Sequence, residues 1–149
     1  MKVKFASQVF SRTVSCTMGY LADNGILPVE CKETADVLLF FDNLFDSVNG
    51  SFTKNRFAKP LLGPVTPHSK HHEFWMQAKK VLKSMKFITD KNKIASVPTI
   101  NNWVWTLESI ESLIKILTID HNVTSFWMRH LNQIPIETFL WGYKKSWVA

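Results

Sequence analysis

Apolar side chains recur at helical spacing along much of the chain. The most regular stretch, residues 33–50, reads ETADVLLFFDNLFDSVNG, and its apolar positions are Val37, Leu38, Phe41, Leu44, Phe45 and Val48. Intervals of three and four residues predict an amphipathic helix that begins at Glu33 or Thr34. The dipeptide Asn49-Gly50 is a typical signal for the end of a helix.

The same period predicts helices on both sides of this stretch. They cover residues 4–21, 73–85 and about 102–117, and residues 125–145 are expected to be helical at both ends around Pro135. The stretch TDKNK predicts a turn, and the basic, proline-containing residues 51–72 predict a loop. No stretch shows the alternation of a strand, so the predicted fold class is mostly α.

The chain is short, basic and rich in apolar residues. Its 149 residues suit one compact domain, and 46% hydrophobic residues suffice for a core. A net charge of +6 favours anionic partners such as nucleic acid or nucleotides. Cys16 and Cys31 form no CxxC motif, and no apolar run suggests a membrane span or a signal peptide. The predicted location is the nucleus or the cytoplasm.

Three aspartates, Asp36, Asp42 and Asp46, lie within the apolar helix predicted over residues 33–50. Asp42 and Asp46 share a helical face, where like charges destabilise a helix unless a cation or a hydrogen-bond donor lies between them. Asp46 and Asn49 are three residues apart, so a carboxylate and an amide could lie over a ligand or a hydrated magnesium ion. A solvated polar edge explains the same pattern, and both interpretations stay open.

Lys2 and Lys4 lie at the start of the first predicted helix. A helix N-terminus offers unpaired N–H groups and a positive dipole end, which suit phosphate oxygens. Ser11, two turns further on, could add a hydroxyl. The alternative is that the lysines are surface charges and Ser11 is an ordinary polar position, and composition alone favours it.

Two other kinds of site are disfavoured. His68, His71 and His72 cluster without a nearby cysteine in a loop rich in proline and serine, which favours a solvated loop over a metal site. The chain contains neither GxxxxGK[ST] nor GxGxxG, so the two familiar phosphate-binding loops are absent.

Three motifs in order resemble the P element transposase family, which includes the THAP-domain transposase-like proteins. They are KVKFASQVFSRTV, ETADVLLFFDNLFDSVNG and RHLNQIPIETFLWG. The resemblance implies an α-helical GTP-binding insertion domain over residues 1–122. It also implies the partial start of a C-terminal RNase H-like segment over residues 123–149.

The resemblance also implies roles for particular residues. Lys2 and Val3 would lie against the nucleotide, and Ser11 would lie near its phosphates. Asp46 and Asn49 would form the polar pair of the second helix, with Asp46 contacting Mg²⁺. These roles make GTP and Mg²⁺ the expected cofactors.

The late motif carries two further implied positions. Glu137 falls on the third carboxylate of the DNA-cutting triad of the family. Ile134 stands where the family has an aspartate that resembles a reader of the guanine base, because a carboxylate accepts from both N–H groups on the guanine edge. Isoleucine cannot form these hydrogen bonds.

The sequence thus predicts a fragment or domesticated remnant of a P element-like DNA transposase. It would bind a guanine nucleotide, and its basic surface could contact DNA. Transposition by the chain alone is not expected, because the other two family acids come from upstream strands. The alternative is a non-enzymatic helical interaction module that has lost nucleotide binding.

Overall fold

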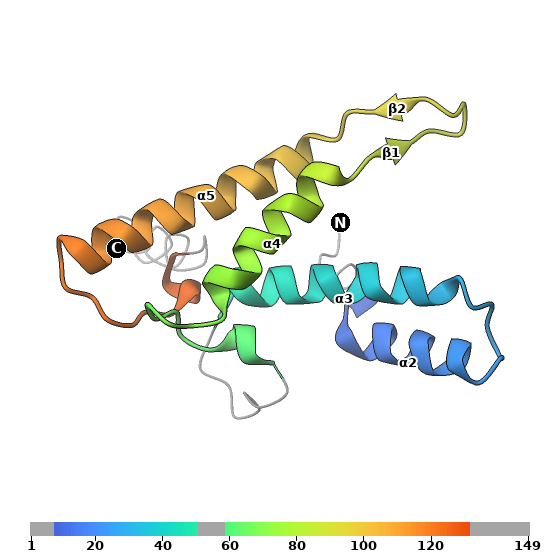
Figure 1. Cartoon of the computed structure of the whole chain (residues 1–149), viewed down its shortest axis with the longest axis horizontal. Coiled ribbons are helices and arrows are strands. Elements are labelled where there is room, and N and C mark those ends of the chain that lie inside the picture. The colour runs from blue at the N-terminus through green and yellow to red at the C-terminus, as the bar shows by residue number, and fades with distance from the viewer. Residues whose placement is uncertain (1–7, 51–58, 132–149) are drawn as a thin grey trace, which may run out of the picture. The chain divides into compact units, whose positions relative to one another are not determined.

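The computed structural model describes residues 8–50 and 59–131 (Figure 1). Among them, the helices are α2 (Arg12–Asp23), α3 (Cys31–Val48), α4 (His71–Ser84) and α5 (Pro98–Ile119), with 3-10 turns η2 (Pro60–Leu62) and η3 (Met128–Leu131) and strands β1 (Phe87–Ile88) and β2 (Ile94–Ala95). The predicted mostly α fold class is confirmed. Contacts group α2, α3, η2 and η3 into one unit and α4, β1, β2 and α5 into another.

Helices α2 and α3 of the first unit form an antiparallel hairpin (Figure 1). The Ser15 hydroxyl donates a buried hydrogen bond to the carbonyl of Ala35 at 2.7 Å, and the rings of Phe10 and Phe41 meet edge to face at 5.5 Å. The residue numbers rise from Phe10 to Ser15, while those of the partners fall from 41 to 35, as antiparallel packing requires. Leu44 is completely buried in this unit.

Helix α2 has well-defined ends. The Ser11 side chain accepts a hydrogen bond from the amide of Val14 at 3.3 Å, so Ser11 is the N-cap and α2 starts after it. The continuous helix predicted over residues 4–21 is therefore wrong at this cap, while its first residues lie outside the described range. The helix ends in a Schellman motif, in which Gly25 has φ +70° and the amide of Ile26 donates to the Leu21 carbonyl.

Helix α3 ends where the sequence predicts. It begins at Cys31, slightly before the predicted start, and ends at Val48 with Asn49 as its C-cap. Gly50 is buried, and a Cβ on it would lie 2.9 Å from the carbonyl oxygen of Gly63. Glycine is thus needed here because η2 and the residue after it pass close to the end of α3.

Helices α4 and α5 of the second unit are also antiparallel. The ion pairs Lys79–Glu111 and Lys83–Glu108 link them, and Trp75 and Leu107 are completely buried. Helix α5 begins earlier than predicted because Pro98 is tolerated in a first turn, where its missing N–H has no partner to lose.

The prediction that the chain has no strand is wrong. Between α4 and α5, β1 and β2 pair antiparallel in the register Phe87↔Ala95 and Ile88↔Ile94. Each strand has only two residues, too few to show alternation. The turn predicted at TDKNK is confirmed, with Asn92 at φ +56°.

The histidine-containing segment is more ordered than a solvated loop. His71 is 1% exposed at the start of α4, and its Nδ1 lies 3.1 Å from the Ser69 hydroxyl. The ring of His72 contacts the Thr66 carbonyl at 2.9 Å, while His68 is exposed. The loop prediction is therefore wrong for His71, because its ring packs beside Trp75. In the described ranges, no helix is long and apolar enough to span a membrane.

Candidate functional site

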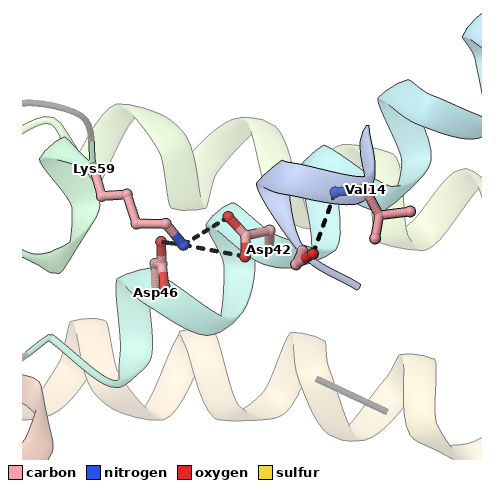
Figure 2. Close-up of polar contacts among 5 residues, drawn as sticks. Val14, Asp42, Asp46 and Lys59 are labelled. Atoms are coloured by element: carbon pink, nitrogen blue, oxygen red, sulfur yellow. Dashed lines mark hydrogen bonds and ion pairs between the residues drawn. The ribbon is translucent and has the colours of Figure 1, made fainter. Parts of the chain in front are cut away.

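The C-terminal half of α3 carries a cluster of three charged side chains, Asp42, Asp46 and Lys59. The Lys59 ammonium donates to both carboxylate oxygens of Asp42, at 3.2 Å from Oδ1 and 2.9 Å from Oδ2. It also lies 2.9 Å from Oδ2 of Asp46. Figure 2 shows the lysine side chain reaching from the segment before η2 toward both aspartates. A lysine of the chain itself therefore lies between these like charges.

The charged cluster is largely shielded from water. The side chains of Asp42, Asp46 and Lys59 are 10%, 15% and 30% exposed. Two carboxylates and one ammonium leave a formal charge of −1. Removing a charge from water costs free energy unless hydrogen bonds or an opposite charge compensate for the lost hydration. The interactions of each carboxylate therefore matter for stability.

The two aspartates are not equivalent. Asp42 accepts two directed hydrogen bonds, whereas Asp46 Oδ2 accepts none from the described residues, so its 2.9 Å contact with Lys59 is an ion pair without hydrogen-bond geometry. Burial and, to a smaller extent, the neighbouring Asp42 carboxylate raise the pKa of Asp46, and the lowering effects of the Lys59 ammonium and of Arg12 do not fully offset them. Asp46 is the less well satisfied carboxylate.

Lys59 keeps its charge despite being partly buried. Burial lowers the pKa of its ammonium, but the contacts with Asp46 and Asp42 raise it by more, so the net shift is upward. The ammonium is consequently a fixed positive charge at neutral pH.

The structure describes three of the nucleotide-binding residues implied by the resemblance. Ser11 caps α2, and Asp46 is paired with Lys59. Asn49 is exposed at the end of α3, where its backbone N–H donates to the backbone carbonyl of Asp46 at 3.3 Å. Lys2, Val3, Ile134 and Glu137 lie outside the described residues. Asp36 is exposed, whereas the interpretation of Asp42 as part of a solvated polar edge is wrong, because Lys59 holds it in a buried position.

Sequence analysis did not identify Lys59. It lies 17 residues after Asp42 in the segment expected to be a loop, so no local spacing connects the two. The indirect signal was the need for a cation between two acids on one helical face. In the described residues, no three side chains of the types His, Cys, Asp and Glu gather where they could hold a metal ion.

Comparisons with known proteins give two matches. Residues 1–60 match the protein family described as "TNP-like, GTP-binding insertion domain". The chain is 32% identical over 97 residues to the human protein DNA transposase THAP9, and the aligned part covers 63% of this chain and 10% of that protein. The chain thus spans about a tenth of the length of this curated relative. No solved structure matches.

Proposed function

We propose that the chain belongs to the P element-like transposase family and binds a guanine nucleotide through the unit that contains α2 and α3. The observation that carries this proposal is the match of residues 1–60 to a family described as GTP-binding. Those residues include all of α2 and α3 as well as Lys59. The whole-protein activity of the relative is not needed for this function.

The geometry of Ser11 supports a phosphate contact. Its oxygen accepts from the Val14 amide, which leaves the hydroxyl hydrogen able to donate to a phosphate oxygen. Ser11 also precedes the N-terminus of the 12-residue helix α2, whose positive dipole end favours an anion. The resemblance adds Lys2, Val3 and Asn49 to the proposed nucleotide site.

The residues present do not fit the magnesium ion that was expected at Asp46. Its Oδ2 is buried and faces the Lys59 ammonium at 2.9 Å, and Asp42 binds the same ammonium through both oxygens. A positive charge of the chain therefore lies where the ion would bind. The proposed function includes GTP and assigns no role to a metal at Asp46.

Titration calorimetry with GTP tests the proposal. Ser11→Thr keeps both the hydroxyl and the cap, so it should bind like the natural chain. Ser11→Asp keeps a good N-cap but places a carboxylate against the phosphates, and we expect binding to weaken about tenfold or more. Absence of heat with the natural chain would contradict the proposed function. Equal binding by Ser11→Asp would contradict only the role of Ser11.

Base selectivity is proposed to be weak because the family position that reads guanine holds Ile134. Unpaired polar groups on a bound base cost affinity, so losing the carboxylate removes discrimination of roughly 10²-fold. Competition of ATP against a fluorescent GTP analogue should reveal only a slight preference for GTP, and Ile134→Asp should increase it. Strong guanine selectivity in the natural chain would mean that another group reads the base.

The alternative function is that of a helical interaction module without nucleotide binding. The exposed apolar side chains of α5 favour it: Trp105, Ile116 and Ile119 are 64%, 49% and 74% exposed. Calorimetry separates the two functions, because a folded chain that gives no heat with GTP under any condition fits only the interaction module.

A further inference from the structure

We propose that the Lys59 ammonium is the resident cation of the Asp42–Asp46 carboxylate pair and keeps divalent metal ions out of it. Three carboxylate oxygens surround the nitrogen, two from Asp42 at 3.2 and 2.9 Å and one from Asp46 at 2.9 Å. These oxygens are the same atoms that a divalent ion would need. Figure 2 shows the lysine nitrogen between the two side chains.

An ion and the ammonium cannot share this position. Mg²⁺ binds oxygen at about 2.0–2.1 Å in near-octahedral geometry, so it would have to approach the carboxylates more closely than the nitrogen does. The two cations would also repel each other strongly in a site that is largely shielded from water. A metal ion must therefore displace Lys59 before it can bind.

The chain opposes that displacement because the backbone of Lys59 is anchored. Lys59 directly precedes η2, in which Leu61 is 6% exposed. The carbonyl oxygens of Leu62 and Gly63 would lie 3.2 and 2.9 Å from a Cβ on Gly50, which shows how tightly this segment passes the end of α3. An anchored side chain has a high effective concentration at its partners, whereas a free metal ion pays the full cost of association.

One consequence concerns nucleotide binding and rests on the proposed function. If GTP binds, any difference between its affinities in Mg²⁺ and in EDTA should not depend on Asp46, because Mg²⁺ can still bind the phosphates of the nucleotide. Asp46→Asn should then leave any residual effect of Mg²⁺ unchanged. Failure of GTP to bind at all would overturn the proposed function and leave the metal-exclusion proposal to the direct test with metal alone.

The direct test is titration of the full chain with Mn²⁺, followed by the electron paramagnetic resonance signal of the free ion. We expect the natural chain not to bind Mn²⁺ at Asp46. Any saturable Mn²⁺ binding that it shows should therefore persist in Asp46→Asn. Lys59→Met removes the ammonium that contacts both carboxylates, and its Mn²⁺ affinity should rise about tenfold or more. The matched control is Lys32→Met, which removes the same charge from an exposed pair with Asp23 and should not gain affinity.

Three results would overturn the proposal: Mn²⁺ binding by the natural chain that Asp46→Asn abolishes, an unchanged affinity in Lys59→Met, or an equal gain in Lys32→Met. Circular dichroism shows whether Lys59→Met folds. If it does not, the comparison of the natural chain with Asp46→Asn decides. Asp46-dependent Mn²⁺ binding contradicts metal exclusion, and its absence supports it.

Discussion

A buried acid is stable only when its lost hydration is replaced, and Asp42 and Asp46 meet this condition unequally. The side chain of Asp42 is 10% exposed and receives two hydrogen bonds from Lys59. Asp46 shares the same ammonium but accepts no directed hydrogen bond on Oδ2 from the described residues. Because hydrogen bonds to charged groups contribute more than neutral ones, Asp42 should carry most of the stabilisation in this cluster.

This difference predicts unequal effects of removing each charge. Asp42→Asn should lower the free energy of unfolding by about 1–2 kcal/mol, because Lys59 loses its better partner inside a partly buried site. Asp46→Asn should cost about 0.5 kcal/mol or less, because it also removes repulsion between two carboxylates. Urea unfolding measures both. Asp36→Asn is the matched control on the exposed face of α3 and should change stability little.

The raised pKa of Asp46 predicts an unusual dependence of stability on pH. The folded chain binds the proton at Asp46 more tightly than the unfolded chain does, in which the pKa of the aspartate has its ordinary value of 3.8. The stability contributed by this group is therefore present below that value and is lost as pH rises through the higher folded pKa. The free energy of unfolding of the natural chain, relative to Asp46→Asn, should increase as pH falls from about 6 to 3. A decrease over this range in urea titrations would mean that the pKa is lowered instead.

At the scale of elements, the close passage of η2 beside the end of α3 sets a strict limit on Gly50. A Cβ there would meet backbone oxygens of Gly63 at 2.9 Å and Leu62 at 3.2 Å, and backbone cannot move aside as easily as a flexible side chain. Gly50→Ala should therefore lower the free energy of unfolding by about 1–3 kcal/mol.

Gly19 provides the matched control for this substitution. It lies inside α2, and a Cβ at this position would have no neighbouring atom within 4 Å, so alanine adds helix propensity without a clash. Gly19→Ala should raise stability by about 0.5–1 kcal/mol. Thermal unfolding of the two variants should shift in opposite directions, and a shift in the same direction would contradict the steric argument.

Local sequence signals predicted an element well where a residue type strongly prefers one position in that element. The end of α3 at Asn49-Gly50 is confirmed, although Gly50 is needed for close packing and its φ is not positive. The N-cap at Ser11 was missed because an apolar stripe on both sides of it suggested a continuous helix. Strands of two residues leave no periodic signal, so β1 and β2 could not be predicted from alternation.

At the scale of the whole molecule, contacts between distant residues were the part that sequence reasoning could not supply. The spacing of Asp42 and Asp46 raised the question of a cation or donor between them, but which residue lies there depends on tertiary packing. Of the residues implied by the resemblance, Ser11, Asp46 and Asn49 can be placed in the fold. The assignment of a nucleotide-binding role to them stays a prediction, as does the domain boundary at residue 122.

The net charge of +6 predicts loose binding to DNA. Lysine and arginine side chains that neutralise phosphates release counterions, so affinity falls steeply with salt. For about four phosphate contacts, affinity for duplex DNA should drop roughly 10²-fold between 50 and 200 mM salt. Fluorescence anisotropy with unrelated duplexes should give the same affinities, because this attraction does not depend on base sequence. Single-stranded DNA with the same number of contacts should show a shallower salt dependence, since its counterion atmosphere is less dense. Binding that is insensitive to salt would mean that apolar contacts or base recognition, rather than the overall charge, hold the DNA.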